Sequence, residues 1–308
     1  KMRVITPLQI KRVNIDTTVQ TKAIRFPTDA RLYNRARERL VKEARKRGLR
    51  IKQSYERVGP QLLMMSARYA HARQPKRAAA CTRKLRTNLG RIIRQIERQK
   101  HDPKGKLAKL LAVAKKIHVQ ERKDKNKIYS VHEPHVQCIA KGKAGKKYEF
   151  GNKVSVAVTS EGGWLVGTKS MQGNPYDGHT LEKQLEQTRR MTKGQVKEVH
   201  VDMGYQGHDH KGKETIHVDR RRRGNIGRRL WKRMKHRAAV EPTIGHCKNE
   251  HRMERNRLWG EAGDAVNALL SAASMNFGKL LAAFLRLFIR LLFGITPSPR
   301  PLCLSHAA

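Results

Sequence analysis

A long helix-patterned segment interrupts a chain whose other segments carry strand patterns, and this order restricts the folds that the sequence can adopt. From about Ala30 to Val119 apolar residues recur at helical spacing, as in Leu32, Ala36 and Leu40. Strand-like runs lie before this segment, around residues 13–19, and return after about residue 126. The order predicts an α/β fold in which a long helical segment separates the first strand from the later ones.

The later strands are short and are separated by turn residues. A tight turn at residues 161–163 predicts an antiparallel meander, and helices are expected from near His179, over residues 225–237 and from near Ala238. Trp259 is expected in the core or as a packing anchor. The predicted strands have the sequences KIYSVHE, HVQCIAKG, YEFGNKVSVAVT, WLVGTKSMQ, VKEVHVDMGY and TIHVD.

The charge of the chain limits the classes of partner. Its 308 residues contain 68 Lys and Arg against 25 Asp and Glu, a formal net charge of +43. Such a chain binds phosphate backbones through counterion release, so nucleic acid is the expected partner. The basic residues are spread along the chain, which argues against a membrane surface, and 5% aromatic content argues against binding single strands mainly by base stacking.

The cysteines and the apolar C-terminal segment restrict compartment and membrane association. Cys81, Cys138, Cys247 and Cys303 form no CxxC pair, which favours a reducing cytosol over a disulfide framework or a zinc knuckle. The apolar segment 279–293 is about fifteen residues long, whereas a membrane span needs roughly 20. We interpret it as an amphipathic helix that closes the core or forms a partner surface, rather than as a helix lying on a membrane.

Three acidic residues in strand or helix patterns suggest a site for divalent metal. Asp16 lies on the polar face of the first strand, Asp202 ends a later strand, and Glu241 begins a helix whose first turn also holds Pro242. Carboxylate oxygens are the ligands that Mg²⁺ prefers, and two such ions can promote in-line cleavage of a phosphodiester. The three residues are therefore candidates for a site that cuts and joins a polyanion.

Each of these residues also has a structural interpretation. Asp16 can keep a strand edge soluble, Asp202 can form a turn before Gly204, and Glu241 can interact with a helix dipole. Asp177 is expected to shape a turn or cap a helix, with metal binding as the alternative. Zinc binding is the less favoured interpretation of three histidines that lack paired-ligand spacing, namely His208, His210 and His217.

Five motifs, in the same order and over nearly the entire chain, resemble the DDE transposases of bacterial insertion sequences, in the group usually numbered five. They are IDTTVQTKAIRFPTDARLYN, YEFGNKVSVAVT with GNPYDGHTL, VDMGYQG, RAAVEPTIGHCKNEHRMERNRLWG, and GDAVNALL. The resemblance implies an α/β fold with an RNase H-like core, a mixed sheet flanked by helices with a large helical insertion after its first strand. In this core Asp16, Asp202 and Glu241 bind two Mg²⁺ or Mn²⁺ ions. It also implies a transposase that cleaves double-stranded DNA and transfers strands between element ends and target, working as a homodimer on synapsis.

The resemblance extends to basic residues around the glutamate. The family spacing of arginine, glutamate and lysine is reproduced by Arg237, Glu241 and Lys248, whereas Met234 stands where a tyrosine is frequent. We expect Arg237 and Lys248 to hold DNA phosphates near the cut. Further DNA contacts are expected from the basic run Arg220, Arg221, Arg222 and Arg223.

The start of the chain modifies the expected function. Members of this family usually carry a long helical N-terminal region that helps to recognise terminal inverted repeats, and here only fifteen residues precede Asp16. We therefore expect DNA binding with little sequence preference, in the bacterial cytoplasm and associated with the nucleoid. The alternative function is a catalytically silent transposase remnant that only binds DNA.

The same patterns predict five segments. The first core strand and its loop occupy residues 1–29, the basic helical insertion 30–125, and the rest of the catalytic core 126–260. A C-terminal amphipathic helix is expected over 261–293. Residues 294–308, with Pro297, Pro299 and Pro301, are expected to form a disordered tail.

Overall fold

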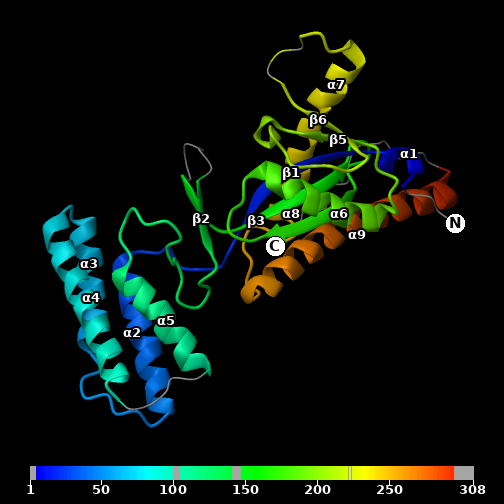
Figure 1. Ribbon diagram of the computed structural model, residues 1–308. Helices are drawn as coiled ribbons and strands as arrows, with labels where there is room; N and C mark the ends of the chain where they lie inside the picture. The colour runs from blue at the N-terminus through cyan, green and yellow to red at the C-terminus, as the bar shows by residue number, and fades with distance from the viewer. Residues whose placement is uncertain (1–4, 100–104, 141–146, 221, 223, 295–308) are drawn as a thin grey trace. The chain divides into compact units, whose positions relative to one another are not determined.

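The protein is a mixed α/β chain that divides into two compact units. A computed structural model describes residues 5–99, 105–140, 147–220, 222 and 224–294 (Figure 1). One unit consists of Lys1–Lys22 with Gly151–Ala308, and the other is Ala23–Phe150. The predicted fold class is confirmed. The limits predicted for the five segments stay predictions, and residues 295–308 of the predicted tail lie outside the described residues.

The sheet of the first unit combines antiparallel and parallel pairs. β1 (Arg12–Thr21) pairs antiparallel with β3 (Tyr148–Thr159), and β3 pairs antiparallel with β4 (Leu165–Met171). On its other side β1 pairs parallel with β5 (Glu198–Val201), which pairs parallel with β6 (Thr215–Val218). Within the described residues the strand order is β2-β3-β1-β5-β6 with β4 on β3, where β2 (Gln137–Ala140) belongs to the second unit.

Helices cover both faces of this sheet because successive strand residues point to opposite sides. Val13 and Ile15 pack with Leu181 and Leu185 of α6 (Leu181–Thr192). On the opposite face alternate valines of β3 pack against α8 (Val240–Asn249) and α9 (Gly260–Phe293). The remaining short helices are α1 (Pro7–Ile10), η1 (Asp177–Thr180), η2 (Met203–Tyr205), α7 (Arg228–His236) and η3 (Arg237–Ala239).

The apolar segment 279–293 is the second half of the longer helix α9. Ala268, Ala272 and Met275 in its first half are buried against the sheet. Leu281 and Leu291 in its second half are 61% and 75% exposed. By length and composition α9 is able to cross a membrane, and 22% of its most apolar window is buried in the protein. The predicted absence of a membrane partner stays a prediction.

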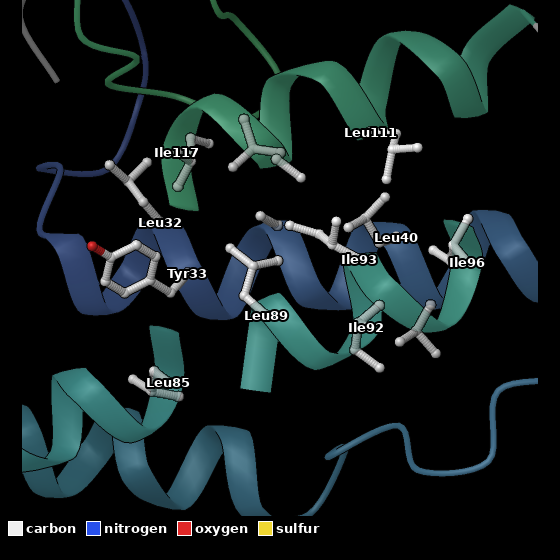
Figure 2. Packing of buried hydrophobic residues seen from close by; sticks show 14 of the residues in the cluster. Leu32, Tyr33, Leu40, Leu85, Leu89, Ile92, Ile93, Ile96, Leu111 and Ile117 are labelled. Atoms are coloured by element: carbon white, nitrogen blue, oxygen red, sulfur yellow. The ribbon is translucent and has the colours of Figure 1, made fainter. Parts of the chain in front are cut away.

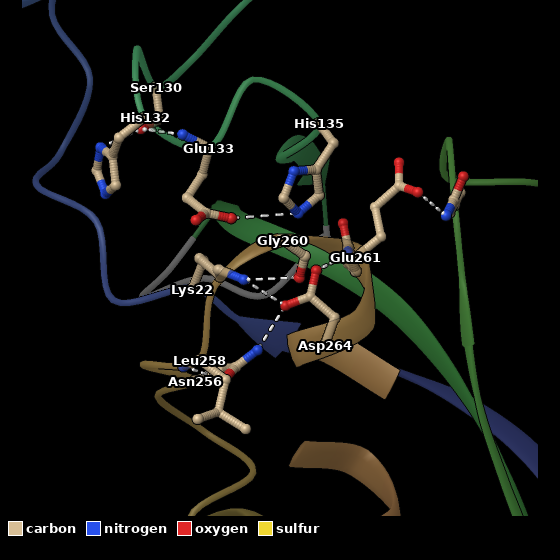
Figure 3. Close-up of polar contacts among 12 residues, drawn as sticks. Lys22, Ser130, His132, Glu133, His135, Asn256, Leu258, Gly260, Glu261 and Asp264 are labelled. Carbon is tan, nitrogen blue, oxygen red and sulfur yellow. Dashed lines mark hydrogen bonds and ion pairs between the residues drawn. The ribbon is translucent and has the colours of Figure 1, made fainter. Parts of the chain in front are cut away.

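A buried polar network joins the end of β1 to the start of α9 (Figure 3). Lys22 and Asp264 form an ion pair with 2.6 Å between Nζ and Oδ1, and Lys22 also donates to the carbonyl of Gly260. The side-chain amides of Asn152 and Asn256 donate to the same carboxylate. Four separate segments of the first unit therefore meet at one carboxylate, in agreement with the rule that buried charges are paired.

The second unit packs four helices around a core of Leu and Ile (Figure 2). Leu40 of α2, Leu89 and Ile92 of α4, and Ile117 of α5 are fully buried there. The side chain of Thr28 caps α2 by accepting a hydrogen bond from the backbone N–H of Arg31. The helices are α2 (Asp29–Lys46), α3 (Val58–His71), α4 (Pro75–Glu97) and α5 (Gly105–Val119).

Two local predictions are wrong. Residues 127–133 form no strand, because the side-chain amide of Gln120 bonds both to the N–H and to the carbonyl of Ile128 and replaces a strand partner there. Trp259 is 72% exposed and therefore lies outside the core. It precedes α9 as a residue with extended backbone.

Candidate functional site

Two of the predicted acids, Asp16 and Asp202, lie level with each other on neighbouring parallel strands. β1 and β5 align Val13 with Val199 and Asn14 with His200. Two further residues along the same register align Asp16 with Asp202, which directly follows the last residue of β5. Neighbouring strands are about 4.8 Å apart, and aligned residues of parallel strands point to the same side. The register thus brings the two carboxylates together.

Asp219 extends this pair to a row of three. β5 and β6 align Val201 with Val218, so the next residues along are Asp202 and Asp219, and the N–H of Asp219 donates to the carbonyl of Val201 at 2.8 Å. Sequence reasoning missed Asp219. The signal was present, because the short motif His-Val-Asp ends both β5 and β6.

Backbone donors fix the two predicted aspartates. The N–H of Thr17 donates to Asp16 Oδ1 at 2.7 Å, and the N–H of Gly204 donates to Asp202 Oδ1 at 2.9 Å. Asp202 thereby caps the short helix η2. A side chain on Gly204 would crowd this arrangement, since a Cβ there would lie 3.0 Å from Asp202 Oδ1. A backbone amide therefore helps to orient each of the two carboxylates.

The third predicted acid, Glu241, lies in the first turn of α8, with Pro242 beside it as predicted. Its side chain is 67% exposed, whereas that of Asp16 is 17% exposed. The charge of Glu241 still reaches Asp16, where it contributes to a raised pKa. Glu241 thus lies at the mouth of the site and the aspartates lie at its base.

Burial and nearby negative charge both raise the pKa values of the aspartates. Burial, followed by the charge of Asp202, raises the pKa of Asp16 to about 6. Burial also raises the pKa of Asp202, with Asp177 and Asp219 as further causes, against the opposing charge of Arg237. Crowded, partly buried carboxylates of this kind favour the binding of a cation.

Arg237 supplies part of the missing positive charge. Its Nη1 lies 3.4 Å from Asp16 Oδ2, its Nε 4.0 Å from Asp219 Oδ2, and its Nη2 4.0 Å from Glu241 Oε1. The side chain is 11% exposed. Arg237 therefore faces three acids here, and its expected contact with a DNA phosphate stays a prediction.

The other predicted site residues lie in different surroundings. Lys248 is half-buried on α8, seven residues beyond Glu241, and Arg220 and Arg222 are exposed. Arg221 and Arg223 lie outside the described residues. Asp177 begins η1, pairs with Lys153 Nζ at 3.0 Å and accepts a hydrogen bond from the hydroxyl of Thr17 at 2.8 Å.

The three histidines considered for zinc have separate partners. His210 contacts Glu182 and Glu214 at 2.6 and 3.5 Å. His217 stacks on His200 with ring centroids 5.0 Å apart, and the centroids of His208 and His210 are 6.3 Å apart.

The donor set of the site fits a hard divalent ion, although the side chains are not closed around one. In the part of the chain that the structure describes, no three His, Cys, Asp or Glu side chains are gathered closely enough to hold a metal. The carboxylates of Asp16, Asp219 and Glu241 nevertheless all lie within 4.0 Å of the Arg237 guanidinium. The charge of Asp219 also raises the pKa of Asp202. Carboxylates without sulfur or imidazole ligands match Mg²⁺ or Mn²⁺.

Comparisons with known proteins agree with the predicted resemblance. Residues 204–281 match the family described as "Transposase DDE domain", a segment that contains Arg237, Glu241 and Lys248 but neither Asp16 nor Asp202. A 68-residue segment is 52% identical to "Uncharacterized protein ORF8 in nfe locus" of Rhizobium meliloti, which covers 22% of this chain and 33% of that relative. No solved structure gives a significant match.

The resemblance to DDE transposases is thus confirmed, and the match supports a transposase function in general. The group number predicted from the motifs is not confirmed. This chain spans about a third of the curated relative that it matches.

Proposed function

We propose that the protein is a metal-dependent DNA transposase that cleaves a phosphodiester and transfers the freed 3′-hydroxyl to target DNA. The observation that carries the proposal is the row of aspartates at the carboxyl ends of β1, β5 and β6, with Glu241 above it on α8. Residues 204–281, which contain Glu241, match a transposase domain, and this match supports the same reaction class. The proposal also includes an RNase H-like core, synapsis as a homodimer and a location in the bacterial cytoplasm.

Asp16, Asp202 and Glu241 are the proposed ligands of two Mg²⁺ or Mn²⁺ ions. When bound, such ions lower the pKa of the attacking water or hydroxyl and stabilise the charge on the leaving oxygen. The protein's own contribution is positional: the amides of Thr17 and Gly204 hold the carboxylates in fixed directions before substrate arrives. Little acid-base chemistry is needed from side chains in phosphoryl transfer.

Arg237 is proposed to change partners during the reaction. Without substrate its guanidinium neutralises Asp16, Asp219 and Glu241. With a divalent ion held by Asp16, Asp202 and Glu241, the guanidinium would no longer be needed to neutralise Asp16 and Glu241, and it could then grip phosphate oxygens bidentately. Asp219, which also pairs with Lys235 at 3.1 Å, is the acid toward which Arg237 can move.

The test is cleavage and strand transfer on duplex DNA with Mg²⁺ or Mn²⁺, using the variants Asp16→Asn, Asp202→Asn and Glu241→Gln. Each is expected to lose at least a hundredfold in rate while keeping its circular dichroism spectrum. Each aspartate variant should also weaken Mn²⁺ binding in calorimetric titration. Glu186→Gln, an exposed change on α6 away from the site, is the matched control. Full activity in the three site variants would refute the assignment.

A catalytically silent DNA-binding protein is the second candidate. It is favoured by the ion pair of Arg237 with Asp16 and by the absence, among the described residues, of three acids close enough to hold a metal. This candidate predicts DNA binding without calorimetric binding of Mn²⁺. Measurable Mn²⁺ affinity that is lost in Asp202→Asn decides for the enzyme.

A further inference from the structure

The solvent face of α4 is densely basic and carries almost no acid. Within Pro75–Glu97 the one acidic residue is Glu97, whose carboxylate is paired with Lys115 at 2.6 Å. The opposite face of the helix is buried in the core of the second unit, with Leu85, Leu89 and Ile92 (Figure 2). Eight cations on the helix or just after it are exposed, namely Lys76, Arg77, Arg83, Lys84, Arg86, Arg91, Arg94 and Arg98.

Four of these cations form a regular ridge. Arg77, Lys84, Arg91 and Arg98 follow one another at intervals of seven residues. Seven residues are close to two helical turns, so each step advances about 10 Å along the same side of the helix and the four span about 32 Å. One turn of B-form DNA is about 34–36 Å long. The ridge therefore matches one turn of duplex in length.

The described part of the chain leaves the charge of the ridge without a neutralising carboxylate. Among the described residues, none of the four side chains lies within ion-pair distance of a carboxylate, whereas Arg45 elsewhere in the unit pairs with Glu56 at 2.7 Å. Neutral groups orient two of the four. Arg91 donates to the hydroxyl of Tyr55 at 3.1 Å, and Arg77 lies 5.7 Å from the ring centroid of Tyr69. The positive charge stays available to an external anion.

The composition of the face selects the class of anion. α4 contains no aromatic residue, which argues against single strands held by base stacking. Between the cations the exposed residues are small, such as Ala79 and Thr87, so nothing on this face would enter a membrane. Exposed Asn or Gln side chains, which read bases, are also lacking on α4 in the described chain.

We propose that the α4 ridge binds the phosphate backbone of double-stranded DNA without reading its sequence. The ridge belongs to the helical unit and not to the acidic site, and the proposal rests on the proposed function only for the choice of DNA as the natural polyanion. Its role is to hold duplex DNA along the protein over about one turn. Because phosphate contacts release counterions, the ridge makes a defined contribution to the salt dependence of binding.

The experiment compares two fourfold variants of the full chain. The first carries Arg77→Gln, Lys84→Gln, Arg91→Gln and Arg98→Gln. The control removes four cations of the same unit that are already paired with carboxylates, through Arg35→Gln, Arg45→Gln, Arg47→Gln and Lys115→Gln. Both variants change the net charge equally, and circular dichroism checks that both fold.

The readout is the Kd for two unrelated duplexes of about 30 base pairs, measured by fluorescence anisotropy at several salt concentrations in EDTA. Each lost phosphate contact lowers the slope of log Kd against log salt by about 0.9, so the ridge variant should lose about 3 to 4 of slope on both sequences. The control variant should change far less. An equal loss in both variants, an unchanged slope in the ridge variant, or tighter binding to single strands would overturn the proposal.

Binding in EDTA is independent of metal chemistry, so the two proposals fail separately. Loss of slope in the ridge variant supports the ridge even if no cleavage is found with Mn²⁺. Conversely, metal-dependent cleavage with an unchanged slope supports the acidic site and rejects the ridge.

Discussion

Removal of Asp264 is predicted to destabilise the first unit strongly. Its carboxylate is 2% exposed and accepts hydrogen bonds from Lys22, Asn152 and Asn256. Asp264→Ala leaves the buried ammonium of Lys22 without this ion pair and the two amides without this acceptor. Breaking a buried pair by deleting one partner costs about 3–5 kcal/mol, which is a large share of the roughly 5–15 kcal/mol that stabilises a domain.

Urea unfolding followed by tryptophan fluorescence measures this effect. The three tryptophans, Trp164, Trp231 and Trp259, all lie in the first unit, and Trp164 is buried. With an m-value of about 2 kcal/mol/M, a loss of about 4 kcal/mol lowers the urea midpoint by about 2 M. Asp264→Asn keeps the shape and one acceptor oxygen, so we expect a smaller loss.

Two further variants identify the cause. Lys22→Met with Asp264→Leu removes both charges together, so it should cost clearly less than the sum of the single changes. Glu161→Ala breaks the more exposed pair of the same unit, in which Arg12 lies 3.2 Å from the carboxylate, and should cost less than about 1 kcal/mol. If Asp264→Ala costs no more than Glu161→Ala, or if the double variant is additive, the ion pair does not have the assigned role.

Two other predictions concern protons and thiols. Hydrogen bonds from Arg189 lower the pKa of Glu214, so the unfolded state binds more protons and this stabilisation is lost as pH falls below about 4.5. Urea midpoints at pH 7 to 3 should fall less steeply in Arg189→Met than in the wild type, and an equal fall would contradict the assignment. Burial raises the pKa of the Cys247 thiol to about 11, so at pH 8 iodoacetamide should modify the half-buried Cys81 before Cys247, which should react only in urea. Mass spectrometry reads out the order, and early labelling of Cys247 would show that the thiol is accessible.

The strands and two of the three acids were predictable because they depend on local alternation. Val13, Ile15 and the polar residues between them place Asp16 on β1, and the same pattern leads to Asp202 after β5. Asp219 was missed because its significance depends on the parallel pairing between β5 and β6, which is non-local and becomes visible only when the repeated His-Val-Asp motif of the two segments is compared. The side-chain partners of the site residues could not be predicted from the sequence for the same reason.

The remaining differences have causes that the spacing of apolar residues along the sequence does not reveal. Residues 127–133 alternate as a strand does, but the amide of Gln120 satisfies the backbone of Ile128. The environment of Arg237 follows from the meeting of η3 with the ends of β1 and β6, so its pairing with three acids could not be predicted from its spacing to Glu241.

The point at which the helical unit leaves the sheet has an evolutionary consequence. Thr21 at the end of β1 is the partner of Gly151 in β3, so the chain departs and returns at two adjacent positions of an antiparallel pair. Such a pair can be closed by a turn of two residues, and loop closure becomes only slowly more costly as a loop lengthens. An ancestor with a plain hairpin at this site could acquire, exchange or lose the whole bundle in one step while its carboxylates stayed in register.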